Sequence, residues 1–197
     1  LRAQIDRAEF GGRDFGGIEL DAELDSQRLS GRISDRDEAL RLLLSVSGTL
    51  TEREQRIGLS GSVFGFDLAA LGVSPEPIGG SFALDASASA AGKGAYAARI
   101  ALDSIEIRNK HRTDRIRPTS VSLHTDSAAT RAEAASGDLS LTFSTPQSAD
   151  SLIAALTRSA RALAGQIDAQ SIDMEQLKPA LPDFALRVSA GPDNILN

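Results

Sequence analysis

Strict alternation of apolar and polar residues is the feature that most constrains the fold of this chain. The segment Ile18–Asp25 has the sequence Ile-Glu-Leu-Asp-Ala-Glu-Leu-Asp, so apolar and acidic residues occupy alternate positions. Successive side chains of a β-strand point to opposite faces, whereas a helix would spread both sets around its circumference. The segment therefore predicts a strand with one apolar and one charged face.

The same alternation recurs along most of the chain, interrupted by short polar turns. One apolar face runs from Leu40 to Leu50, residues 51–54 turn the chain, and a second face runs from Ile57 to Val63. Further strands are expected at residues 29–33, 82–88, 96–102, 105–107, 121–125 and 139–143, with a hairpin turn at 92–94. Consecutive strands joined by short turns predict a mainly β protein built as an antiparallel meander.

The pattern changes to a helical period after residue 145. Thr145 is expected to cap a helix that has Pro146 in its first position. The apolar stripe of this helix is Leu152, Leu156, Ala160, Leu163 and Ile167. A second short helix is predicted from a capping box of Asp173 and Gln176 flanked by Ile172 and Leu177, and it closes at Pro182.

Strand alternation resumes at Phe184, so the helices are expected to interrupt a sheet and not to form a separate domain. We therefore expect three parts in one fragment: a sheet region at 1–145, a helical insertion at 146–182 and a returning strand at 183–197. The chain begins at Leu1 without a methionine or signal peptide, and we expect it to be a segment of a longer protein.

Composition excludes several classes of function. The net charge is −6 and no run of Lys or Arg forms a basic stripe, so a nucleic-acid partner is not expected. The cluster at His111–Arg117 is interrupted by Asp114 and is interpreted as a solvated loop. Without Cys there is no disulfide, thiol catalysis or Cys-ligated zinc, and no window has the roughly 18 apolar residues of a membrane-spanning helix.

No catalytic or metal-binding constellation is present in the sequence. His111 and His124 lack the spacing of a zinc site, and no carboxylate or serine motif pairs with either. The acidic residues of 19–25 lie along one flat strand face, which does not converge as calcium ligands must. We therefore expect a non-enzymatic protein without a metal or cofactor.

The aliphatic face of the predicted strands is the remaining candidate site. Aromatic residues are 4% of the chain, with no Trp, so this face suits flexible apolar ligands better than stacked rings. The candidate residues are Ile18, Leu20, Leu24, Leu42, Leu44, Val46, Ile57, Leu59, Val63, Phe82, Leu84, Ile100, Leu102, Leu139, Leu141 and Phe143. Periodicity alone favours a closed core of packed sheets, and the alternative is a groove that stays open and holds acyl chains.

Several segments together resemble the TamB / AsmA-like (DUF490-type) envelope family, in particular the TamB-like proteins of Bacteroidetes-type bacteria. The segments are Phe15–Ala22 with Asp25 and Ser26, the connector Phe66–Val73, the "GDL" strand Ser136–Phe143, and Leu181–Phe184 with Gly191–Asn194. Each motif alone has low specificity, and the resemblance depends on their order along most of the chain.

The resemblance implies a fold and a function that periodicity does not. The fold would be an elongated sheet curled into an open, taco-like β-groove with an apolar inner face. The parent protein would be anchored in the inner membrane, cross the periplasm, carry phospholipid toward the outer membrane and partner an Omp85-class outer-membrane barrel. The alternative is a closed-core protein-interaction scaffold for outer-membrane assembly that binds no lipid. The helical insertion could cap the groove.

Overall fold

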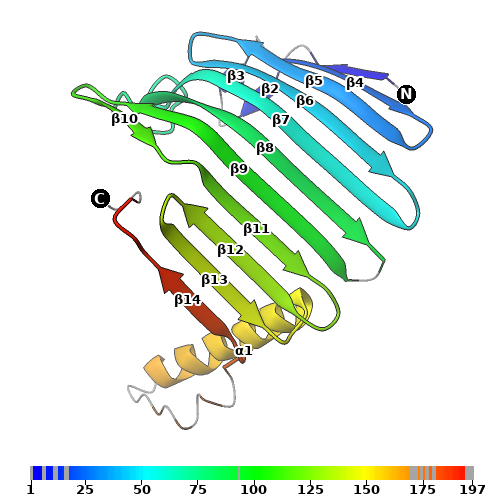
Figure 1. The fold of residues 1–197 in the computed structure, drawn as a ribbon, viewed down its shortest axis with the longest axis vertical. Helices are drawn as coiled ribbons and strands as arrows, with labels where there is room; N and C mark the ends of the chain where they lie inside the picture. The colour runs from blue at the N-terminus through cyan, green and yellow to red at the C-terminus, as the bar shows by residue number, and fades with distance from the viewer. Residues whose placement is uncertain are drawn as a thin grey trace.

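One antiparallel sheet dominates the molecule (Figure 1). The computed structural model describes residues 2–5, 8–10, 13–15, 18–92, 94–168, 173, 175, 178 and 181–193. Within them the sheet contains β1 (Arg2–Ile5), β4 (Glu19–Asp25), β5 (Arg28–Arg36), β6 (Leu40–Leu50), β7 (Glu54–Asp67), β8 (Gly79–Ala91), β9 (Ala95–Arg108), β10 (Thr113–Ile116), β11 (Thr119–Thr125), β12 (Thr130–Ser136), β13 (Leu139–Thr145) and β14 (Ala185–Ser189). The strands β2 (Ala8–Phe10) and β3 (Arg13–Phe15) pair with each other, and α1 spans Ala149–Asp168.

The sheet is an antiparallel meander, as the alternation predicts, and it is open, which the alternation did not predict. Its strand order is β1-β4-β5-β6-β7-β8-β9-β11-β12-β13-β14, with β10 paired to the remaining part of β9. Apart from the β2–β3 pair, all described strands belong to this single sheet, and the extensive contacts between elements are those between hydrogen-bonded strand neighbours. The two-sheet core considered from the sequence is therefore not the arrangement that the chain adopts.

The register gives the sheet two chemically different faces. A cross-strand row pairs Leu20 with Ile33, Ile33 with Leu44, Leu44 with Gly61, Gly61 with Leu84 and Leu84 with Leu102. Directly opposed residues project to the same side of a sheet, so these rows form one face, which we call the apolar face. The intervening rows form the polar face, where Asp21 pairs with Arg32 and Ser60 with Asp85.

Two bulges adjust the long strands without exchanging the faces. Leu42 pairs with Val63 and Leu40 pairs with Phe66. Between these two pairs β6 has one residue and β7 has two, so β7 contains one extra residue there. A second irregularity separates Ala83–Asp103 from Ser81–Glu106, where Ser104 has a positive φ of 52°. Each bulge adds one unpaired residue to one strand. Beyond the bulge, the apolar residues of that strand therefore still project to the apolar face.

Five strands lie where the sequence analysis did not predict them, namely β1, β2, β3, β10 and β12. The segment interpreted as a solvated loop contains β10, which pairs with β9 because β11 covers only residues 96–102 of that strand. The Asn109 side chain accepts hydrogen bonds from the backbone of His111 and Arg112 and so stabilises the turn between β9 and β10. The unpredicted strand β12 pairs along its whole length with β11 and β13.

The connector after β7 is a hydrogen-bonded turn. The carboxylate of Asp67 accepts hydrogen bonds from the backbone of Ala69 and Ala70, and Leu71 N–H donates to the Asp67 carbonyl. Gly72 ends this turn with a φ of 73°, a conformation that glycine adopts without steric cost.

The start of α1 differs from the prediction. Thr145 still belongs to β13, where it pairs with Thr130, so the predicted Thr145 cap was wrong. Ser148 caps the helix instead, because its hydroxyl accepts the Ser151 N–H at 3.3 Å and its carbonyl accepts the Leu152 N–H. Of the predicted second helix, Ile172, Gln176 and Leu177 lie outside the described residues.

Candidate functional site

The register places the predicted site residues on one face of the sheet. Every candidate from Leu20 to Phe143 lies on the apolar face, and Ile18 lies one residue before β4. One cross-strand row contains Leu24, Leu29, Gly48 and Ile57, each paired with the next. In other rows Val46 pairs with Leu59, and Val63 pairs with Phe82. Residues distant in the sequence therefore form one continuous aliphatic surface.

Exposure varies widely over the apolar face. Leu44 and Val63 are 7% and 6% exposed, whereas Ile100 and Val121 are both 49% exposed. Exposure remains high at Val188, which is 58% exposed on β14. A contiguous exposed apolar surface of this kind is a candidate site for a ligand, a membrane or a protein partner.

One cross-strand row contains several of these exposed residues, and we call it the open row. It is formed by Ala86, Ile100, Val121, Ala134, Leu141 and Val188, which pair successively from β8 to β14. A parallel row includes Phe143, which pairs with Leu186 on β14 and whose ring stacks on Phe184 with centroids 5.7 Å apart. Val121 and Val188 were not among the predicted site residues, although the same alternation would have identified them.

Threonine side chains close one end of the apolar face. Thr125, Thr130 and Thr145 pair along that face and are 1–3% exposed. Thr130 Oγ1 donates to the Gln147 carbonyl at 2.8 Å, so the Thr125 hydroxyl must donate the 2.8 Å bond between the two threonines. Thr125 Oγ1 in turn accepts the Ala149 N–H at 3.0 Å.

These hydrogen bonds fix the segment between β13 and α1 against the end of the apolar face. The backbone carbonyl of Asp183, just before β14, accepts the Thr145 hydroxyl at 2.6 Å and holds the returning segment at the same end. Figure 1 shows α1 beneath the ends of β11–β13. The helix therefore lies at one margin of the apolar face and leaves the open row uncovered.

The predicted stripe of α1 points away from its packed side. Ala155 and Ser159 are buried at 4% and 9% exposure, while Leu156, Leu163 and Ile167 are 41–56% exposed. Small residues permit close approach, so they and not the leucines occupy the packed side of this helix. The exposed stripe adds a second apolar surface next to the sheet.

The polar face balances its charges across neighbouring strands. The acidic residues of β4 face basic or hydroxyl side chains of β5, with Asp21 opposite Arg32 and Asp25 opposite Arg28. Within the described part of the chain, no group of three or more His, Cys, Asp or Glu side chains is arranged to hold a metal. His124 lies on the polar face beside Arg131, and His111 lies in the β9–β10 turn.

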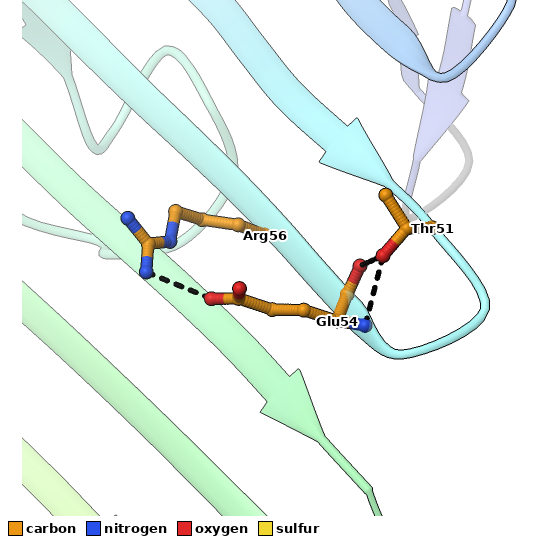
Figure 2. A network of polar contacts seen from close by, with 3 residues as sticks. All are labelled: Thr51, Glu54 and Arg56. Carbon is orange, nitrogen blue, oxygen red and sulfur yellow. Dashed lines mark hydrogen bonds and ion pairs between the residues drawn. The ribbon is translucent and has the colours of Figure 1, made fainter.

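Hairpin turns fix charged side chains at the edge of this face (Figure 2). Thr51 Oγ1 donates to the Glu54 carbonyl at 2.7 Å and accepts the Glu54 N–H at 2.9 Å, while the Glu54 carboxylate pairs with Arg56 at 2.8 Å. In the β11–β12 turn, hydrogen bonds from the N–H groups of Ala128 and Ala129 lower the pKa of Asp126.

Comparison with known proteins identifies no relative: the chain matches no family model, no curated protein and no solved structure. Among the residues that the structure describes, α1 lacks the combination of length and hydropathy that a membrane-spanning helix needs.

Proposed function

We propose that this chain is a segment of a periplasm-spanning envelope protein whose apolar face binds phospholipid and conducts it between the inner and outer membranes. The observation that carries the proposal is the open row, where half-exposed aliphatic side chains from consecutive strands adjoin without a covering layer. In the sequence, the order of the TamB / AsmA-like motifs supports the same function.

The dimensions of the open row suit an acyl chain. Strands are about 4.8 Å apart, so the row from Ala86 on β8 to Val188 on β14 extends about 24 Å. One leaflet of a bilayer core is about 15 Å thick, so an acyl chain can lie along the row. Each methylene removed from water contributes about 0.8 kcal/mol, and aliphatic side chains offer no fixed geometry that would hold the chain in one place.

The wider role of the parent protein belongs to this proposal. By resemblance, the parent is anchored in the inner membrane, lies in the periplasm and supports outer-membrane assembly with an Omp85-class barrel. The second candidate function is a protein-interaction scaffold for outer-membrane assembly without lipid binding. The exposed stripe of α1, with Ile167 56% exposed, is the observation that favours the scaffold.

Native mass spectrometry with lipid extraction tests the proposal. Val121→Glu places a charge in the open row, whereas Ser120→Glu places the same charge one residue earlier on the polar face. We expect the unmodified chain and Ser120→Glu to retain co-purified or added phospholipid, and Val121→Glu to lose it. Because Val121 is 49% exposed, the change should leave the fold intact, which circular dichroism checks.

A chain that binds no phospholipid in any form would contradict lipid conduction and favour the scaffold. Equal loss in both folded glutamate variants would also contradict it, because a charge on the polar face does not touch the open row.

A further inference from the structure

The polar face has a hollow that the proposed lipid function does not use. It has a volume of about 570 Å³ and extends over β7, β8, β9, β11 and β12. A neighbouring hollow of about 610 Å³ shares Arg56 and Ser87 with it, so the two form a continuous trough toward β4. Chemically distinctive residues of the first hollow are Arg56, Arg99, Arg131, His124, Ser87, Ser122 and the carboxylate of Glu133.

Arginines surround the first hollow in an otherwise acidic chain. Arg56, Arg99 and Arg131 lie on β7, β9 and β12, so successive arginines are two strands, or about 10 Å, apart. Arg56 is held by Glu54 at 2.8 Å, as Figure 2 shows, and Arg131 by Glu133 at 2.6 Å. No carboxylate in the described residues forms an ion pair with the central Arg99.

The surroundings of Arg99 provide hydrogen-bond donors and free space. Arg99 stands directly between Ser87 on β8 and Ser122 on β11, and its neighbours on the same face of β9 are Ala97 and Ala101. The short side chains leave the guanidinium uncovered, and both serine hydroxyls can donate beside it. A planar guanidinium with adjacent hydroxyls matches the oxygens of a tetrahedral oxyanion, because it can donate two parallel hydrogen bonds.

We propose that this hollow is an anion site that binds the phosphate group of an organic phosphate ester. Arg99 binds the phosphate bidentately, Ser87 and Ser122 donate hydrogen bonds, and Arg56 and Arg131 contribute positive potential from the margins. The site lies on the opposite face from the open row, so a lipid whose acyl chains lie in that row cannot place its headgroup here. The proposal is therefore independent of lipid conduction.

Titration of the 197-residue chain with glycerol 3-phosphate, at constant ionic strength, tests the site. Backbone amide shifts in ¹H–¹⁵N spectra should move around Ser87, Arg99 and Ser122 as the ester is added. Arg99→Gln should weaken binding by at least about tenfold, since a charge-assisted bond is lost, while Arg99→Lys should retain part of the affinity. Arg161→Gln is the matched control, because it removes one charge from an exposed position on α1.

A second titration with phosphatidylglycerol vesicles distinguishes the source of the phosphate. Binding of glycerol 3-phosphate that depends on Arg99 supports a soluble ester as the ligand. Binding to vesicles alone, with the same dependence, supports the same phosphate chemistry carried on a membrane surface. Equal weakening by Arg99→Gln and Arg161→Gln would overturn the proposal, as would amide shifts that leave the hollow unaffected.

Discussion

Shortening two side chains of the apolar face to alanine should have very different effects on folding. Leu44 is 7% exposed between Ile33 and Gly61, whereas Ile100 is 49% exposed between Ala86 and Val121. Leu44→Ala removes buried methyl groups and leaves a cavity, which costs about 3 kcal/mol of unfolding free energy. Ile100→Ala loses about half of the free energy gained by fully burying an isoleucine side chain, and it leaves no closed cavity. The expected loss of unfolding free energy is therefore about 1 kcal/mol.

Urea denaturation of the lipid-free protein, followed by circular dichroism, measures both values. The slope of the unfolding free energy against urea should be the same in the two variants, so their midpoints can be compared directly. Adding phospholipid should then reverse the contrast. A ligand stabilises the folded state it binds, so Leu44→Ala should keep most of the lipid-induced shift and Ile100→Ala should lose much of it.

Equal costs for the two alanine variants in lipid-free protein would refute this reasoning. They would mean that the stretch between β8 and β11 is covered in solution and that the exposed fraction of Ile100 does not describe the folded chain. Ser120→Ala, on the polar face beside the open row, is the control and should change stability by less than about 0.5 kcal/mol.

Two further predictions concern the backbone. Gly61→Ala should cost at least about 2 kcal/mol, because φ is 151° and the added methyl group would collide with the Leu43 carbonyl oxygen, whereas Gly58→Ala on the same strand should cost less than about 1 kcal/mol in the same denaturation assay. The pKa of Asp126 should lie below its ordinary value of about 3.8 in a ¹³C carboxyl titration, so its stabilising effect is present at neutral pH and is lost as pH falls through the lowered value. A titration midpoint at or above 3.8 would contradict that assignment.

Strands with large aliphatic side chains could be predicted from the sequence, and others could not. Leucine and isoleucine at alternate positions identify β4 and β6, because only a strand separates the two residue classes so completely. The apolar side of β12 has only Ala132 and Ala134, which are too small to give a clear signal. The strand β10 forms because β9 extends beyond β11, and no local pattern at residues 113–116 encodes that.

The candidate sites depend on relations that alternation does not contain. An open sheet and a closed sandwich need the same period, so the exposure of Ile100 and Val121 could not be derived from the sequence. The buried side of α1 has Ala155 and Ser159, which a search for large apolar residues passes over. Arg99 faces Ser87 and Ser122 only through the register of β8, β9 and β11.

The pairing of strands with their neighbours in the chain makes the molecule close to one-dimensional. In such an array stability is nearly a sum of hairpin contributions and neighbour interfaces. Strain or damage in one hairpin should then spread only to the adjoining strands. Insertion or deletion of a hairpin would change the length of the apolar face by about 10 Å without requiring the remaining strands to repack.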